Sequence, residues 1–121
     1  MFVRFDVTET HHFSRKPLGV LHAIRYLRDD GFLTRAELIL SNKIFAWMFS
    51  HLDAPSEEII IKYPDAISWF RSTAILHISK TELLVSIAES HGLIVNRRQR
   101  TRLSRIVYQD SHQVLARSRI V

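Results

Sequence analysis

The hydrophobic pattern of this chain changes its period along the sequence. From Phe2 to Thr8 apolar and polar residues alternate, which is typical of a β-strand buried on one side. The middle of the chain repeats apolar residues every three or four positions, as helices do. Residues 93–116 return to three short strand-like runs. This order predicts an α+β fold with a small antiparallel sheet of about four strands and helices packed on one face.

Two of the helical patterns have recognisable ends. Pro17 suits the first turn of a helix that ends near Gly31, where glycine can adopt the left-handed conformation. A later pattern covers residues 72–92, which also ends at a glycine. Residues 66–70 fit either a strand or a helix, and both interpretations stay open. The predicted order is therefore strand, two or three helices, then three strands, within one domain spanning residues 1–121.

Another helix is predicted between these two. It begins at Thr34, which together with Glu37 forms a capping box in which each side chain bonds the other residue's backbone amide. It ends before Pro55. Its apolar residues cover more than one stripe of the helix, so we expect it to be buried on two sides, either within the fold or against a partner.

The compartment follows from what the sequence lacks. There is no cysteine, which excludes disulfides and thiolate metal sites and fits a reducing cytoplasm. The first ten residues do not form the apolar core of a signal peptide. No segment approaches the roughly 18 uncharged apolar residues of a membrane span. We expect a cytoplasmic protein without a membrane partner.

Short motifs spread over nearly the whole chain follow the pattern of one protein group. They are Phe2-Val3-Arg4-Phe5, Leu27-Arg28-Asp29-Asp30-Gly31, Trp47 with His51-Leu52 before Pro55, Ala66-Ile67-Ser68-Trp69-Phe70, and Ile106-Val107-Tyr108-Gln109-Asp110 followed by Gln113-Val114 and Ala116. In these motifs the chain resembles a family of small uncharacterised bacterial proteins. The resemblance implies a single domain, and since the family has no assigned activity it supplies no catalytic residues. Ser104-Arg105 stands where the relatives have proline-glycine.

Positive charge is concentrated at one end of the sequence. Residues 93–121 hold seven arginines against one aspartate, a net charge of +6, whereas the first 92 residues sum to −1. Five of these arginines lie in and around a predicted β-hairpin: Arg97, Arg98, Arg100, Arg102 and Arg105. A guanidinium offers a forked pair of donors that suits phosphate, so the cluster is a candidate site for nucleic acid or another polyanion. The alternative is a solvated hairpin that only improves solubility.

Large apolar side chains form the second candidate surface. Tryptophan and phenylalanine are enriched in association hot spots, and six residues are candidates for contact with a partner: Phe45, Trp47, Met48, Phe49, Trp69 and Phe70. The alternative is that they form the core. A small sheet also has two edges, and an exposed edge can pair with a second copy. We therefore expect a homo-oligomer, in the simplest case a dimer.

The sequence contains no assembled catalytic or metal-binding motif. It has no His-Glu-x-x-His helix, no Gly-x-Ser-x-Gly elbow and no glycine-rich phosphate loop. Its histidines do not form a ligand pattern: His11, His12, His22, His51, His77, His91 and His112. We predict no metal, no cofactor and no small-molecule ligand. The favoured function is a self-associating, non-enzymatic interaction or regulatory module, with nucleic-acid binding through the arginines and a small enzyme with an unrecognised site as alternatives.

Overall fold

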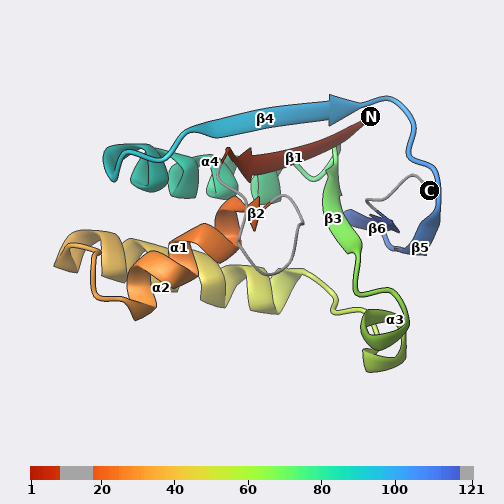
Figure 1. The fold of residues 1–121 in the computed structure, drawn as a ribbon, viewed down its shortest axis with the longest axis horizontal. Helices are drawn as coiled ribbons and strands as arrows, with labels where there is room; N and C mark the ends of the chain where they lie inside the picture. Colours follow the sequence, from red (N-terminus) through yellow and green to blue (C-terminus); the bar gives the residue numbers. More distant parts are fainter. Residues whose placement is uncertain (9–17, 118–121) are drawn as a thin grey trace.

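A curled antiparallel sheet organises the computed structural model of this protein, which describes residues 1–8 and 18–117 (Figure 1). Within those residues there are six strands: β1 (Phe2–Val7), β2 (Leu18–Gly19), β3 (Ala66–Arg71), β4 (Val95–Arg100), β5 (Ile106–Gln109) and β6 (Gln113–Arg117). The sheet order is β2-β1-β3-β6-β5, and β4 pairs with β1.

Four helices accompany this sheet in the described part of the chain: α1 (Val20–Asp29), α2 (Arg35–His51), α3 (Glu57–Lys62) and α4 (Ile75–Ser90). Figure 1 shows α1, α2 and α4 on the same side of β1 and β4, while the short α3 precedes β3. The predicted α+β class, with an antiparallel sheet and helices on one face, is confirmed. The sheet has more strands than the predicted four, because β2 is added and the open segment 66–70 is a strand.

Strand β1 is the centre of the sheet. One of its edges pairs with β4 over all six residues, from Phe2 opposite Arg100 to Val7 opposite Val95. Its other contacts are divided between two strands: β3 pairs with its first two residues, and β2 pairs with Asp6 and Val7. The first strand belongs to the same sheet as the last three, but β4 is separated from the paired strands β5 and β6. The predicted hairpin around the arginines is wrong, because β4 pairs with β1 while β5 pairs with β6.

Side chains of β1 and β3 point alternately to the two faces of the sheet, and each face carries its own apolar cluster. Val3 and Phe5 face the helices, where they meet Ile24, Leu84 and other buried residues of the main core. On β3, Phe70 belongs to this core as well. Its neighbour Trp69 points to the opposite face and packs with Ile67 and Ala116 under Phe2 and Leu103. Both faces of the sheet are therefore partly covered.

The helix boundaries follow local chemistry. The capping box of α2 is confirmed: the Thr34 hydroxyl accepts from the Glu37 amide at 3.2 Å, and the Glu37 carboxylate accepts from the Thr34 amide at 2.9 Å. Helix α1 begins at Val20 and not at Pro17, because residues 18–19 pair with β1 as β2. Pro17 itself lies outside the described residues. None of the described helices is long and apolar enough to cross a bilayer.

Candidate interaction surface

The outer sides of α2 and α4 expose large aliphatic side chains to water. Ile39 and Leu40 lie on α2, and Ile75, Leu76 and Leu83 lie on α4, each with an exposed fraction between 38% and 71%. We call these five residues the α2–α4 apolar face. Both helices bury another set of apolar residues on their inner sides. The expectation that helix 34–52 is apolar on more than one side therefore applies to α4 too.

Helices α2 and α4 pack side by side in opposite directions, so Ile39 and Leu40 lie toward the His91 end of α4, while Ile75 and Leu76 lie toward its other end. At one end, Glu37 of α2 contacts His91, which follows α4, with Oε1 and Nε2 2.8 Å apart. At the other end, the ring of Trp47 lies 4.9 Å from Nζ of Lys80. Lys80 flanks Leu76 and Leu83 on the side of α4 toward α2, since residues three and four apart are neighbours on a helix. The exposed leucines of α4 thus lie beside the α2 contact.

Beside Leu76 and Leu83, two exposed positions of α4 are small and uncharged, whereas the exposed Glu82 lies on the side of Ile75. Ser79 and Ser86 are exposed, and each hydroxyl donates to a carbonyl of its own helix, those of Leu76 and Glu82. A hydroxyl that is already hydrogen-bonded loses little when water is removed. The stripe is therefore suited to close contact with another apolar surface.

The six residues that the sequence analysis proposed as an interface differ in how far they are buried. Met48, Trp69 and Phe70 are buried in the two apolar clusters. Phe45 and Trp47 are half-buried. Phe49 is 90% exposed, but two residues after Trp47 it points to another side of α2. Half of the candidate set thus belongs to the core.

The five candidate arginines are divided between two faces of the sheet and a connecting segment. Arg98 and Arg100 share one face of β4, where each guanidinium carbon lies 5.7 Å from the Trp69 ring centre. Arg97 lies on the other face and contacts Glu82 of α4 at 3.4 Å. Two more lie in the exposed segment between β4 and β5: Arg102 and Arg105. They do not form one continuous row.

The arginines also change how β4 behaves as a sheet edge. Among the described strands β4 pairs with β1 alone, so its second edge is a potential template for another strand. Arginines on an edge strand disfavour such pairing. The other edge, β5, has only four residues and an irregular register. The helical face is therefore a better candidate than either edge for contact with a second copy.

A charged cluster holds β1 to its neighbours. The Asp6 carboxylate accepts from Nε of Arg4 and, at 3.0 Å, from Nη1 of Arg98. Arg4 also donates from Nη1 to the Ser68 carbonyl at 2.8 Å, which links β1 to β3 beyond their two paired residues. Burial lowers the pKa of Arg4, and the Asp6 carboxylate opposes that shift. The cluster therefore has a structural role that the sequence analysis did not identify.

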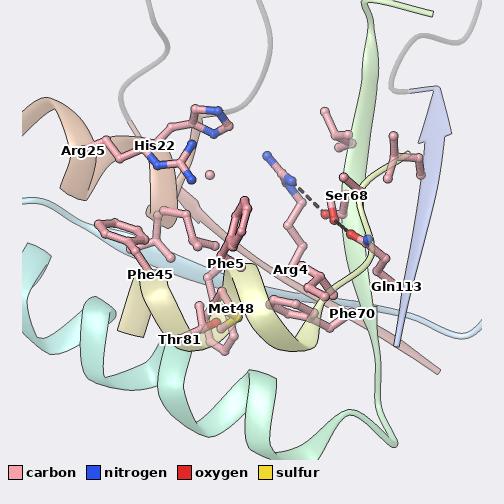
Figure 2. Close-up of a pocket in the computed structure, with 18 of the residues that line it drawn as sticks. Arg4, Phe5, His22, Arg25, Phe45, Met48, Ser68, Phe70, Thr81 and Gln113 are labelled. Atoms are coloured by element: carbon pink, nitrogen blue, oxygen red, sulfur yellow. Dashed lines mark hydrogen bonds between the residues drawn. The ribbon is translucent and has the colours of Figure 1, made fainter. Parts of the chain in front are cut away.

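Beside Arg4 the structure contains a cavity of about 1190 Å³ between the helices and the sheet. Figure 2 shows Phe5, Phe45, Met48 and Phe70 among its apolar residues, with Ser68 and Gln113 on the side toward β3 and β6. These two polar side chains are already bonded to one another at 3.2 Å, and Gln113 also bonds the carbonyl of Asp53. The polar side chains on that side therefore already have hydrogen-bond partners within the protein.

Comparison with known proteins gives no relative. No family model matches the chain, and neither a curated protein nor a solved structure is similar to it. The resemblance to uncharacterised bacterial proteins therefore stays a prediction.

The histidines occupy several different environments. His51 bonds the Trp47 carbonyl through Nδ1 at 2.8 Å, as expected at the end of a helix. His91 instead contacts Glu37, whose pKa is lowered to about 2 by hydrogen bonds from Thr34 and His91. Across residues 1–8 and 18–117, no three potential ligands are placed to hold a metal ion. His11 and His12 lie outside the described residues.

Proposed function

We propose that this protein is a non-enzymatic interaction module that associates with a second copy of itself through the α2–α4 apolar face. The observation that supports this most is the exposure of five large aliphatic side chains on two adjacent helices whose inner sides already form the core. Soluble monomers rarely expose large apolar patches, and Leu76 and Leu83, seven residues apart, are exposed on the same side of α4.

Burying this face in a dimer would recover free energy of the same order as the cost of association. Complete burial of an aliphatic side chain is worth roughly 1.5–3 kcal/mol, so five that are about half exposed offer roughly 4–8 kcal/mol per copy. A two-fold symmetric contact buries the same face twice. The doubled sum is comparable with the roughly 4–15 kcal/mol that association costs in lost freedom of motion.

The charges around the face favour a second copy as the partner. On α4, Lys80 borders one side of the stripe formed by Leu76, Ser79 and Leu83, and Glu82 borders the other side. A two-fold axis running along α4 would place Lys80 of one copy beside Glu82 of the partner subunit. Complementary charges at the border of an apolar contact fix its orientation.

The first prediction concerns the oligomeric state. We expect sedimentation equilibrium to show a dimer at micromolar concentration, and we expect Leu76→Glu or Leu83→Glu to give a folded monomer, because a carboxylate would lose its hydration in the contact. Ile94→Glu is the matched control: Ile94 is 66% exposed but precedes β4, away from this face. A wild-type protein that stays monomeric at all concentrations, or equal effects of all three variants, would contradict the proposal.

A second candidate function is binding of nucleic acid through the arginines. What favours it is the exposure of Arg100 and Arg102 on the outermost strand and the segment that follows it, where the Arg100 hydrogen bond goes to the Gln99 carbonyl. Against it, Arg97 and Arg98 are engaged by Glu82 and Asp6.

The second prediction tests this candidate. If the surface binds a polyanion, single-stranded DNA should bind in low salt, and affinity should fall as salt rises with a logarithmic slope of about −0.7 per phosphate contact. Replacing the five arginines by glutamine should abolish binding. Replacing Arg25, Arg28 and Arg35 of the helical side should not. No salt-dependent binding, or equal losses in both variants, would rule the candidate out.

A further inference from the structure

Four aromatic rings from three separate parts of the fold form a stack at one end of α2. Trp47 and His51 are parallel, with ring centres 4.3 Å apart and planes 8° apart. The edge of His77, from α4, meets Trp47 at 4.8 Å. His112, from the turn between β5 and β6, stacks on His77 at 4.5 Å. We call these residues the ring stack, and three of its four members can take up a proton.

His77 is the buried centre of the stack. Its Nε2 lies 2.8 Å from the carbonyl of His51, an acceptor, so this nitrogen must carry a hydrogen in the neutral ring. A second proton would go to Nδ1 and would place a full positive charge in a site that is 95% removed from water. Burial is the main reason why the pKa of His77 is lowered. The hydrogen bond to the His51 carbonyl opposes this shift, while the proximity of the His112 and His51 rings adds to it.

The charged groups around the stack include few carboxylates that could compensate such a charge. From α4, Lys80 contributes a positive charge above Trp47. From β3, Arg71 donates to the carbonyl of Asp110 and to the side chain of Gln109. Two aspartates face the region, Asp110 in the β5–β6 turn and Asp53 after α2.

Asp110 is already committed to its own turn. Its carboxylate accepts from the amides of His112 and Gln113 and from the hydroxyl of Tyr108 at 2.8 Å. The last bond raises the pKa of Tyr108 to about 12, so that hydroxyl stays protonated and bonded. The carboxylate therefore has limited capacity to stabilise a second or third protonated imidazole.

The ring stack is directly connected to the α2–α4 apolar face. Trp47 belongs to the stack and also contacts Lys80, which flanks Leu76 and Leu83 on α4. Moving the end of α2 away from α4 would displace Trp47 and change the surface beside both leucines.

We propose that the ring stack is an acid-sensitive switch that holds the end of α2 on α4 while His77 is neutral and releases it when His77 is protonated, so that mild acid separates two associated copies. This inference rests on the proposed self-association and supplies its regulation. The direction of the pH effect follows from the difference in proton binding between the folded protein and the unfolded chain. His77 binds a proton less readily in the folded protein than in the unfolded chain, so its contribution to stability is complete above a pH of about 6.5 and decreases as the pH falls below it.

The third prediction is a pH-dependent dissociation. Between pH 7.5 and 5.5 we expect the dissociation constant from sedimentation to rise, by about tenfold for each unit by which the pKa of His77 is higher in the separated copies than in the dimer. The urea midpoint should fall over the same range. In His51→Gln/His112→Gln both pH dependences should shrink, because the two imidazoles that help to lower the pKa of His77 are gone. His22→Gln, on α1, is the matched control and should follow the wild type.

The two proposals fail in different ways. If the wild type is monomeric at pH 7.5, the proposed self-association is wrong. The urea midpoint still tests the switch in that case, because a lower midpoint in acid, and a smaller decrease in the double variant, do not require a dimer. If the dimer persists at pH 5.5, or the double variant keeps the wild-type pH profile, the switch is wrong. NMR titration of His77 gives an independent check: an apparent pKa at or above 6.5 would overturn the inference.

Discussion

Replacing Asp6 by asparagine is expected to lower the free energy of unfolding by about 3 kcal/mol, because removing one partner of a buried charge pair leaves the other in a poorly hydrated site. Asp6 is 4% exposed and accepts from two guanidiniums, those of Arg4 and Arg98. The substitution keeps the size of the side chain but removes its charge and one of the two acceptor oxygens. The loss therefore measures the combined charge and hydrogen-bond contribution of the cluster that holds β1 to β3 and β4.

Asp29→Asn is the matched control for this fourth prediction. Asp29 also pairs with an arginine, Arg28, but its side chain is largely exposed, and exposed ion pairs contribute about 1 kcal/mol or less. Urea unfolding followed by circular dichroism gives both values, provided that the slope with denaturant is unchanged. An Asp6→Asn loss no larger than that of Asp29→Asn would show that the cluster does not stabilise the sheet.

The fifth prediction compares two adjacent leucines of α4. Leu84 is fully buried in the main core, so Leu84→Ala should cost roughly 2–5 kcal/mol through lost burial and the cavity left behind. Leu83 is exposed, so Leu83→Ala should have little effect on the unfolding of the monomer. At concentrations where the protein is a dimer it should instead weaken association.

The same urea experiment at low and high protein concentration separates the two effects. The Leu84→Ala loss should be the same at both concentrations, since it belongs to one subunit. The Leu83→Ala loss should appear only at high concentration, because dimer stability depends on concentration. A large loss for Leu83→Ala at low concentration would place this side chain in the core and remove it from the apolar face.

The fold class could be predicted because it depends on local patterns. The alternation around Val3 and Phe5 and the capping box at Thr34 are visible over a few residues, and both are present in the structure. The pairing of β4 could not be predicted in the same way. Its partner residues are 88 to 98 positions earlier in the chain, and β1 offers six matching residues where β5 offers only four.

The candidate site was predictable only in part, because a helical pattern alone does not say which side of the helix is covered. Trp69 and Phe70 are adjacent residues on a strand, and only the presence of a second apolar cluster buries both. A signal for the missed residues does exist in the sequence. Leu83 and Leu84 are consecutive in a helix and point about 100° apart, so one of them must lie nearer the surface.

The position of β1 also determines when the sheet can be completed. This strand precedes every other described element, yet its six-residue partner is β4, near the other end of the described chain. During synthesis β1 must wait for about ninety further residues before its longest ladder can form. Contacts of such wide separation in sequence slow folding and lengthen the time for which unpaired backbone is available to other chains.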